Sequence, residues 1–491
     1  MVCFRISKSN QVQEYLTPMT AKKKGRKKAS KQARNLIKKL RQQHKKEKTK
    51  KKRKKKKSSV RHTRAIQRDR CKRPLLPPPD EKITVRLSEL VKPTEAEEQG
   101  WFIQFGLRLR KLTLSVMVAI VISLIWRQIG AGGSEAARLL QLEGLLWVPV
   151  MVVSQQAISE RLRTFPATLF FQLLVSRLPI FQQRSQSRQR PLPPALNWAQ
   201  KRYQAVLAVD GSTLDALLRQ VGLLRDEEKN PLAGKIMTVL NVCTLLPHSI
   251  WFEPDAKASD QRFWPHLLTA IPAGALLLLD GGFTNFKRFL QLANLEPKIT
   301  FIIPARSNLV SEVKRCLVKT PQIHDYLVWI GAGDDRQLVR LVKLYYQGQW
   351  FEYLTNELDP NLLPAPYIAA LYGHRWRIED AFNTTKRLLG LAYFWTGSQN
   401  GVELQLWATW LVYMVVVDLS DAVAEALNKP LLAISMEMVY RGLYHFGQAY
   451  AKGEADDPVA YFVLHAKLLG IVKRSLPSQT HWFNLTILPD P

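Results

Sequence analysis

Apolar and polar positions recur with different periods in successive parts of the chain. Between about residues 85 and 180 the apolar residues have the spacing of amphipathic helices, and the run Leu112–Trp126 holds 15 residues without a charge. Between 201 and about 365 the apolar runs are short and are often bounded by glycine, proline or aspartate, as strands are. After about residue 366 the helical spacing returns. The pattern predicts an α/β core with helical regions on both sides.

The first helical region contains three recognisable segments. Leu112–Trp126 is expected to form one buried helix and Ala136–Leu146 a second. Beyond them, Ser154, Gln155 and Gln156 precede an amphipathic segment, which places polar residues at a helix N-terminus, as in short DNA-reading units. A helix that only packs against its neighbours explains the same pattern.

Strands and helices alternate in the central part of the chain. The elements predicted there are the strand Ala205–Val209, a hairpin of Lys235–Leu245 and Ser249–Phe252 turned by Pro247-His248, the helix Arg262–Ala270, the strand Ala275–Leu279, the helix Phe286–Leu292 and the strand Lys298–Pro304. Strand-like runs between about 306 and 365 then predict a β-rich insertion. A long helix is expected over about Pro366–Leu389.

Two apolar segments raise the question of a membrane. Leu112–Trp126 has 15 residues and Leu404–Val417 has 14, and charged residues bound both. A membrane-spanning helix needs about 20 apolar residues. Both segments are therefore expected to be buried helices of a folded core, with no membrane as a partner.

The net charge of +32 is concentrated at one end of the chain. Residues 1–75 contain 30 Lys and Arg against three acidic residues, and the remaining 416 residues carry only +5. Such a segment repels itself and is expected to be disordered when free. The distribution favours a polyanion, most simply nucleic acid, as the partner. A solvated tail without a role, or a start codon assigned too far upstream, explains the arm equally well.

The four cysteines lie far apart and form no C-x2-C pair, so neither a disulfide scaffold nor a structural zinc site is expected. The first ten residues, MVCFRISKSN, have no apolar stretch of the kind that a signal peptide needs. The chemistry must therefore be sought among carboxylates and cations of the α/β core.

Two aspartates follow predicted strands directly. Asp210 comes after Ala205–Val209 and Asp280 after Ala275–Leu279, and each is followed by glycine. Open α/β folds place their ligands at the carboxyl ends of strands, and glycine leaves room there for a turn and a ligand. Either aspartate alone is explained as well by a turn or a helix cap. Together they suggest a shared site.

Five residues of the predicted long helix fall on one face. They are Tyr372, Arg375, Glu379, Phe382 and Lys386, at positions i, i+3, i+7, i+10 and i+14. An ordinary amphipathic helix would bury an apolar stripe at these positions, whereas this one aligns a phenol, a guanidinium, a carboxylate and an ammonium. A ladder of ion pairs on a solvated face is the structural alternative.

Asp210, Asp280 and Glu379 offer oxygen ligands with no clustered His or Cys, which suits Mg²⁺ or Mn²⁺. Two such ions can activate a nucleophile and stabilise a leaving oxygen in phosphoryl transfer. Arg375 and Lys386 would then meet phosphate oxygens. Tyr372 could donate a hydrogen bond to the same phosphate, so each polar residue of the face has a use if the substrate is a nucleic-acid backbone.

The spacing Tyr372-x2-Arg375-x3-Glu379-x6-Lys386 resembles the Y-x2-R-x3-E-x6-K signature of the insertion-sequence-four family of DDE transposases. The blocks Asp210-Gly-Ser-Thr and Asp280-Gly-Gly-Phe resemble the first and second aspartate motifs of that family. The β-rich insertion before the glutamate is also a family trait. The resemblance covers about residues 110–450 and leaves the basic arm outside.

The resemblance implies an RNase H-like α/β core with a β-rich insertion, flanked by helical N- and C-terminal regions. It implies metal-dependent cutting at the ends of an insertion element and joining of the freed 3′-OH to target DNA. Asp210, Asp280 and Glu379 would hold two Mg²⁺ ions (Mn²⁺ is an alternative), and Tyr372, Arg375 and Lys386 would grip phosphates of the double-stranded DNA. A dimer at synapsis and a cytoplasmic, nucleoid-associated location are expected.

Other residues acquire a possible role only through the resemblance. Relatives hold a flipped base with tryptophans of the insertion, which makes Trp329 and Trp350 candidates here, although core packing is the commoner role of a tryptophan. Arg306 could touch DNA or form a surface salt bridge. Asn285-Phe286 replaces the Tyr-Phe that often follows the second aspartate block, which leaves a hairpin intermediate open.

The predicted organisation follows from the pattern and the resemblance together. Its parts are a Lys/Arg-rich arm at 1–75, a helical region at 76–180 that would bind DNA ends, a linker at 181–200, the catalytic core at 201–400 with the insertion at about 306–365, and a helical region at 401–491. A metal-dependent nuclease with the same core and a non-catalytic DNA-binding protein on the same scaffold stay as alternatives. A nuclease cuts DNA but never transfers a 3′-OH, and a scaffold has no need of three converging carboxylates.

Overall fold

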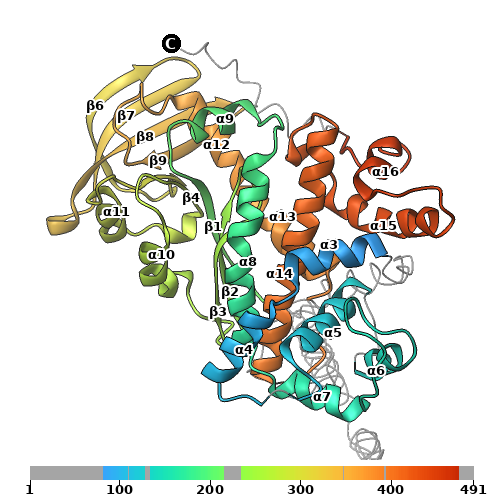
Figure 1. The fold of residues 1–491 in the computed structure, drawn as a ribbon. Coiled ribbons are helices and arrows are strands. Elements are labelled where there is room, and N and C mark those ends of the chain that lie inside the picture. The colour runs from blue at the N-terminus through green and yellow to red at the C-terminus, as the bar shows by residue number, and fades with distance from the viewer. Residues whose placement is uncertain are drawn as a thin grey trace, which may run out of the picture. The chain divides into compact units, whose positions relative to one another are not determined.

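The computed structural model describes residues 81–108, 110–127, 133–214, 234–346, 348–391, 394–396 and 398–474 (Figure 1). The basic arm predicted at 1–75 lies outside the described residues, as does the proline-rich segment that follows it.

A single nine-stranded mixed sheet forms the centre of the α/β part (Figure 1). Its order is β3-β2-β1-β4-β5-β9-β8-β7-β6. The strands are β1 Val206–Thr213, β2 Lys235–Asn241, β3 Pro247–Glu253, β4 Leu276–Leu279, β5 Thr300–Pro304, β6 Ser311–Lys319, β7 Ile323–Ile330, β8 Gln337–Tyr346 and β9 Gln349–Thr355. Only the pairs β1–β4 and β4–β5 are parallel. The prediction of an α/β core is confirmed.

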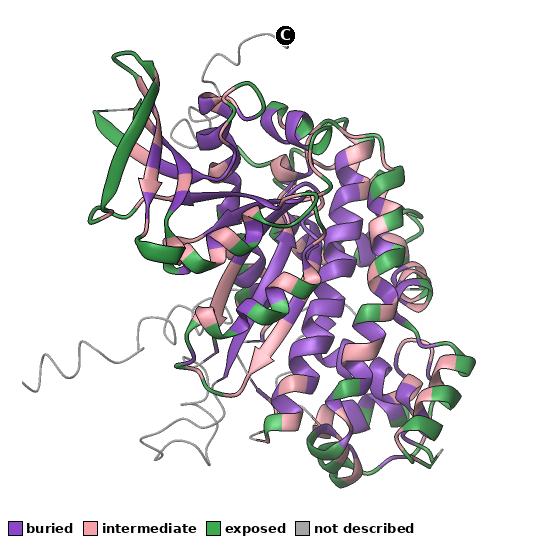
Figure 2. Cartoon of the chain, turned by 90° about the vertical axis from the view of Figure 1, so that its left-hand side faces the viewer, coloured by how far each residue is buried: buried purple, intermediate pink, exposed green. Residues whose placement is uncertain are grey.

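The β-rich insertion does not form a separate layer. Its last strand, β9, pairs antiparallel with β5 through Ile302 and Thr355, so β9, β8, β7 and β6 continue the core sheet outward. The outermost strand, β6, is almost entirely exposed, and Figure 2 shows the burial rising from this edge toward the centre of the sheet. The insertion is thus anchored by a backbone ladder to the strand next to the candidate site.

Seven helices are described before the sheet. They are α3 Glu81–Val91, α4 Glu95–Gln104, α5 Leu114–Trp126, α6 Gly133–Leu142, α7 Gln155–Thr164, α8 Ala167–Ser187 and α9 Pro194–Gln200. The predicted buried helix is confirmed as α5, and Ser154 caps α7 by accepting a hydrogen bond from the backbone N–H of Ala157. Helix α8 continues through Phe181 to Ser187, well into the segment predicted as a linker.

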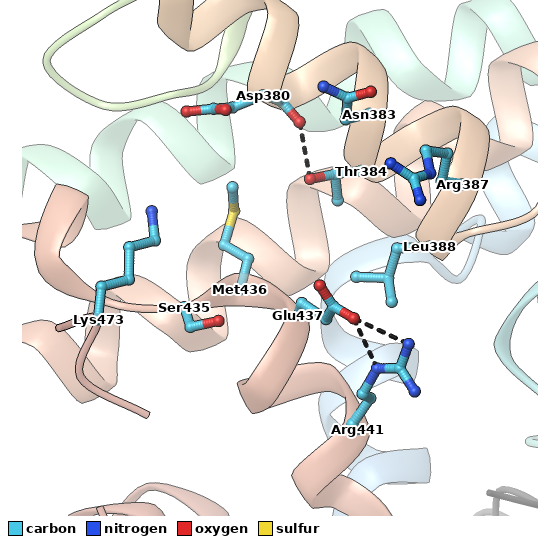
Figure 3. Close-up of a pocket in the computed structure, with 10 residues that line it drawn as sticks. All are labelled: Asp380, Asn383, Thr384, Arg387, Leu388, Ser435, Met436, Glu437, Arg441 and Lys473. Atoms are coloured by element: carbon cyan, nitrogen blue, oxygen red, sulfur yellow. Dashed lines mark hydrogen bonds and ion pairs between the residues drawn. The ribbon is translucent and has the colours of Figure 1, made fainter. Parts of the chain in front are cut away.

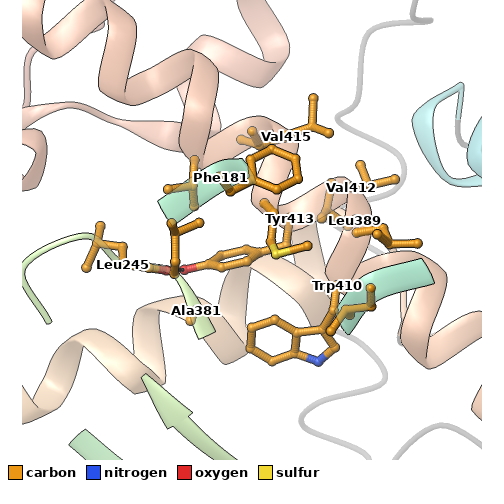
Figure 4. Close-up of a cluster of buried hydrophobic side chains, with 14 of the residues drawn as sticks. Phe181, Leu245, Ala381, Leu389, Trp410, Val412, Tyr413 and Val415 are labelled. Atoms are coloured by element: carbon orange, nitrogen blue, oxygen red, sulfur yellow. Dashed lines mark hydrogen bonds between the residues drawn. The ribbon is translucent and has the colours of Figure 1, made fainter. Parts of the chain in front are cut away.

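The helices between and after the strands carry the rest of the core. They are α10 Trp264–Ala270, α11 Phe286–Ala293, α12 Ala365–Gly373, α13 Arg377–Asn383, α14 Gln399–Ala426, α15 Met436–Ala451 and α16 Pro458–Leu464. Helix α14 is the long one, and it packs along α8. In Figure 4 its residues Trp410 and Tyr413 pack among Phe181 of α8 and Ala381 of α13, and the Tyr413 hydroxyl donates to the Leu245 carbonyl at 2.8 Å. One helix therefore joins the N-terminal helices to the core.

By length and composition α14 could cross a membrane, and α7 with α8 would add a second span if that bent pair were one. The most apolar window of α14 is 94% buried inside the protein. A helix that is apolar on all sides and surrounded by protein has the character of a core helix. The apolar run predicted at Leu404–Val417 is thus the middle of a longer buried helix.

Three local predictions are wrong. Asp210 lies inside β1 rather than after it, because the segment up to Thr213 pairs with β2. The hairpin turns before Pro247 and His248, which both belong to β3. The long helix predicted over Pro366–Leu389 is interrupted by a 3₁₀ turn at His374–Trp376 and ends in a π-helical turn at Thr384–Leu388.

Two aspartates of α14 are buried among arginines. Asp418 is 3% exposed and Asp421 is fully buried. The buried ion cluster consists of these two residues with Arg86 of α3, Arg184 of α8, and Arg188 and Arg190 just beyond α8. Asp418 accepts hydrogen bonds from Arg86 at 2.7 Å and from Arg188 at 2.6 Å. The cluster fixes the end of α8 against α14.

Candidate active site

The first two carboxylates come from neighbouring parallel strands. Val209 of β1 lies beside Leu279 of β4 in the register of the sheet, so the next residues, Asp210 and Asp280, emerge at the same edge. This is the position in which open α/β sheets hold ligands. The topology thus brings together the two aspartates that the sequence singled out.

The third carboxylate reaches the same edge from a helix. Glu379 belongs to the first turn of α13, and Arg375 lies on the 3₁₀ turn just before it. The Arg375 guanidinium is 3.2 Å from the Asp210 carboxylate, 3.2 Å from Glu379 and 3.9 Å from Asp280. All three carboxylates therefore surround one guanidinium. We call these four residues the carboxylate–arginine cluster.

The turn that carries Asp280 is held by polar contacts. The Asp280 side chain accepts a hydrogen bond from the Gly282 N–H at 3.0 Å and caps a 3₁₀ turn, Gly281–Phe283. Arg306 donates to the Gly281 carbonyl at 3.0 and 3.3 Å, and Gln261 donates to the Gly282 carbonyl at 2.6 Å. Arg306, expected to touch DNA or to form a surface salt bridge, holds this turn, and its contact with DNA stays a prediction. Nothing in the sequence singled out Gln261.

Burial dominates the electrostatics of Asp210. Removal from water raises the pKa of its carboxyl to about 6, although the charge of Arg375 and a hydrogen bond from the Gly211 N–H oppose the shift. The Asp210 side chain is 20% exposed, whereas Asp280 and Glu379 are 48% and 37% exposed. Near neutral pH the ionised form of Asp210 is therefore unfavourable in the folded protein and lowers its stability.

The raised pKa of Asp210 predicts that the stability of the protein depends on pH. The folded pKa, about 6, lies above the ordinary value of 3.8, so the stabilisation by protonated Asp210 is complete below the ordinary value and is lost as the pH rises through 6. Asp210→Asn should raise the free energy of unfolding above pH 6 by on the order of 1 to 3 kcal/mol. Thermal unfolding in EDTA over a pH series measures this, and a difference that does not shrink toward acid pH would contradict it.

Gly211 is needed for space rather than for a turn. Neither Gly211 nor Gly281 has a positive φ, so neither position needs glycine for its backbone conformation, although Gly281 begins a 3₁₀ turn. A Cβ at Gly211 would collide with the Asp260 carboxylate and lie 3.0 Å from Lys235 Cε, whereas one at Gly281 would meet only Pro304 at 3.6 Å. Asp260 and Lys235 form an ion pair beside the site that the sequence did not reveal.

Gly211→Ala is therefore expected to destabilise the protein by about 1 to 3 kcal/mol, as overpacking does, and to displace the neighbouring Asp210. Gly281→Ala should leave the midpoint of thermal unfolding nearly unchanged. Differential scanning calorimetry of the two variants tests the difference. Equal midpoints would mean that the Asp260–Lys235 pair moves aside without cost.

The other members of the helical face also reach the site. The Lys386 ammonium contacts the Ser212 hydroxyl and donates to the Thr213 carbonyl at 2.7 Å, so it lies against the end of β1. The Tyr372 ring centre is 5.9 Å from the Arg375 guanidinium carbon, and burial raises the pKa of Tyr372 to about 12. Tyr372 therefore keeps its proton at neutral pH and can act as a hydrogen-bond donor. The structure brings all six predicted site residues to one region.

The tryptophans of the insertion lie in different surroundings. Lys314 and Arg336 both lie over the ring of Trp329, at 5.1 and 5.0 Å from its centre. Trp350 is 40% exposed and stacks on His324 at 4.4 Å. Neither is a core residue, but their role in holding a base stays a prediction.

Asp210, Asp280 and Glu379 fit a hard divalent cation by donor chemistry, because all their ligand atoms are carboxylate oxygens. Their arrangement is a different matter: among the residues that the structure describes, no group of three or more His, Cys, Asp or Glu is placed to hold a metal ion. The guanidinium of Arg375 lies 3.2 Å from both the Asp210 and the Glu379 carboxylates.

A polar pocket of about 260 Å³ lies on the neighbouring face of the same helical segment (Figure 3). Its lining includes Asp380, Asn383, Thr384, Arg387, Glu437 and Arg441. In Figure 3 Glu437 faces Arg441, with which it forms an ion pair of 2.8 Å. None of the six predicted site residues lines this pocket.

Comparison with known proteins shows what the chain resembles. Residues 204–415 match the family described as "Transposase DDE domain". "Putative transposase y4zB" of Sinorhizobium fredii (strain NBRC 101917 / NGR234) is 29% identical over 204 residues, which are 39% of this chain and 54% of that protein. The chain thus spans about half the length of this curated relative.

A solved structure, "Cryo-EM structure of piggyBac transposase synaptic complex with hairpin DNA", covers 80% of this chain and 86% of its own at 12% identity. Its TM-score of 0.40 is too low to establish a common fold. The segment that matches the transposase DDE domain contains Asp210, Asp280, Glu379 and the residues around them.

Proposed function

We propose that this chain is a DDE transposase of the insertion-sequence-four type, which cuts DNA at the ends of an element and joins the freed 3′-OH to target DNA. One observation carries the proposal: Asp210, Asp280 and Glu379, from three distant segments, converge at one edge of the sheet. The match of residues 204–415 to the transposase DDE domain supports it independently.

The catalytic core in this proposal is RNase H-like and consists of β1 to β5 with the helices beside them. The hairpin β2–β3 extends β1 on one side, and the parallel strands β4 and β5 extend it on the other. Asp210 of β1 and Asp280, which directly follows the parallel strand β4, lie at the same edge. This arrangement supports the assignment and gives the insertion β6–β9 the position of an extension beyond β5.

In the reaction, Asp210, Asp280 and Glu379 would hold two Mg²⁺ ions. Bound there, the ions would supply Lewis-acid activation of the attacking oxygen and stabilisation of the leaving oxygen. Arg375 would bind a phosphate of the cleaved strand in a bidentate fork, and Lys386 would add a point charge beside the end of β1. Tyr372, protonated at neutral pH, would donate a hydrogen bond to the same phosphate.

Strand joining separates the proposal from its alternatives. Purified protein is incubated with labelled element-end duplex, Mg²⁺ and a supercoiled target plasmid. A transposase yields cut ends and end–target joints, a nuclease yields cut ends alone, and a non-catalytic DNA-binding protein yields neither. Inverted repeats and a short target duplication in the flanking DNA would support the first outcome.

The partners in this proposal are the terminal repeats of the element and the target duplex, with no membrane involved. Two copies would act together at synapsis, in the cytoplasm beside the nucleoid. Light scattering of the protein with a single element-end duplex gives the mass of the complex. A mass with one protein copy under conditions that support cleavage would contradict the dimer.

Removal of residues 1–75 should weaken DNA binding without abolishing cleavage. The arm carries 30 basic residues, so its loss should reduce the number of counterions released and flatten the dependence of affinity on salt. The core carries the carboxylates and should still cut. Salt titrations of affinity and an end-cleavage assay on the truncated protein test both parts. A folded truncation without any cleavage would show that the arm is required for the reaction.

A further inference from the structure

Arg375 has two uses that exclude each other. In the structure its guanidinium is the counter-charge of Asp210, Asp280 and Glu379, and its side chain is only 6% exposed. In the proposed reaction the same guanidinium binds a DNA phosphate. A buried guanidinium stays where opposite charge compensates it, so a phosphate and the carboxylates compete for this one cation.

The guanidinium of Arg375 and a metal ion likewise compete for the oxygens of the three carboxylates. A Mg²⁺ ion lies about 2.1 Å from its oxygen ligands. The Arg375 nitrogens lie 3.2 Å from an oxygen of Asp210 and from one of Glu379. A divalent cation between those oxygens would meet the guanidinium at close range, where like charges repel strongly. In this geometry the carboxylates can pair with the guanidinium or bind the metal ion, but they cannot do both.

The position of Arg375 in the chain makes a shift feasible. It lies on the three-residue 3₁₀ turn His374–Trp376 between α12 and α13, and such breaks in a helix are common at functional hinges. The rings of Tyr372, in the last turn of α12, and of Trp376, the last residue of the 3₁₀ turn, lie 5.9 and 5.1 Å from its guanidinium carbon. Trp376 is 58% exposed, so one of the two aromatic surfaces already borders the solvent. These rings can accompany the guanidinium as it moves outward.

We propose that Arg375 is the resting counter-ion of the carboxylate–arginine cluster and that a DNA backbone phosphate draws it away, so that DNA and divalent cations bind cooperatively. Without DNA the carboxylates hold metal weakly; with DNA they become free to bind it. Linkage requires the effect to be reciprocal, so metal strengthens DNA binding by the same factor. The consequence is a site that stays poorly loaded with metal until a nucleic-acid backbone is engaged. This inference rests on the proposed function.

The test measures Mn²⁺ binding by electron paramagnetic resonance or calorimetry, on the full-length protein at mildly alkaline pH. The DNA is an element-end duplex already cut at the 3′ end, so no cleavage occurs during the titration. For the wild-type protein, DNA should raise the Mn²⁺ affinity roughly 5- to 150-fold, the usual range of allosteric coupling. The affinity for DNA should rise by the same factor when Mn²⁺ is present.

Substitutions assign the effect to Arg375. Arg375→Gln should bind Mn²⁺ without DNA about as tightly as the wild-type complex does, and DNA should add little. Arg375→Lys keeps the charge and should retain most of the coupling. Arg377→Gln is the matched control: Arg377 lies two residues away, pairs with the exposed Asp380 at 3.1 Å, and should behave as wild type. Circular dichroism melts confirm that each variant is folded.

Combining Arg375→Gln with Asp280→Ala distinguishes a failure of the proposed function from a failure of the counter-ion role of Arg375. If Mn²⁺ binding to the Arg375→Gln protein is unaffected by Asp280→Ala, the metal does not bind the carboxylates and the proposed function loses its metal site. If binding depends on Asp280 but Arg375→Gln leaves the DNA-free affinity unchanged, the counter-ion role of Arg375 is overturned while the proposed function stands.

Discussion

Asp280→Ala is expected to lower the rate of element-end cleavage by about three orders of magnitude or more, as loss of one member of a catalytic unit does in other enzymes. Asp280 lies beside Asp210 at the sheet edge, and its turn is held by Arg306 and Gln261. Its side chain is 48% exposed, so its removal leaves no cavity in the core. The loss should therefore be chemical rather than structural.

Single-turnover cleavage of labelled end DNA measures this effect, and a gel-shift assay should show DNA binding largely retained. Asp456→Ala is the control, because Asp456 is 86% exposed and pairs with Lys82 at the surface of the helical region. The control should cut as wild type does. If Asp280→Ala cuts as well as the control, the assignment of the carboxylates as the metal site is wrong.

Asp418→Ala is expected to destabilise the protein by about 3 to 5 kcal/mol, the cost of removing one partner from a buried ion pair. Its carboxylate accepts hydrogen bonds from Arg86, Arg184 and Arg188, and without it these guanidinium groups compete for Asp421. Burial alone would raise the pKa of Asp418, but the arginines outweigh it and lower the pKa. The stabilisation is therefore present above the ordinary pKa and is lost only as the pH falls through the lowered value.

Urea unfolding monitored by circular dichroism gives the free energies for Asp418→Ala, Asp418→Asn and the surface control Asp456→Ala. The asparagine variant should recover part of the hydrogen bonding but none of the charge. Asp456→Ala should leave the unfolding midpoint unchanged, since exposed ion pairs contribute little. A midpoint for Asp418→Ala that matches the control would mean that the arginines find other partners.

The candidate site was predictable to the extent that its signals are local. A run of apolar residues before Asp280 places it at the end of a strand, and helical spacing places Arg375 with Glu379 on one face. The contact between Arg375 and the carboxylates is not local: Arg375 and Asp210 are 165 residues apart. Helical spacing shows which side chains share a face, but it does not show what lies opposite that face.

The errors in the fold have the same physical origin. The residues after Asp210 resemble a turn, but they form strand because β2 offers them hydrogen-bond partners through Thr213. The polar segment after Phe181 resembles a linker, but Arg184 and Arg188 are bound by aspartates of α14. Likewise, strand-like runs predicted the insertion, but only the pairing of β9 with β5 places it in the core sheet. In each case a distant partner overrides the local preference.

The packing of α8 on α14 also has a consequence for synthesis on the ribosome. Hydrogen bonds between these helices join residues 234 to 236 positions apart. At roughly 5 to 20 residues per second, translation leaves α8 without its partner for about 10 to 50 seconds. During that interval its apolar side and the arginines around it are open to chaperones or to neighbouring nascent chains. Coexpression with a chaperone should therefore raise the soluble yield of this protein more than a lower temperature alone.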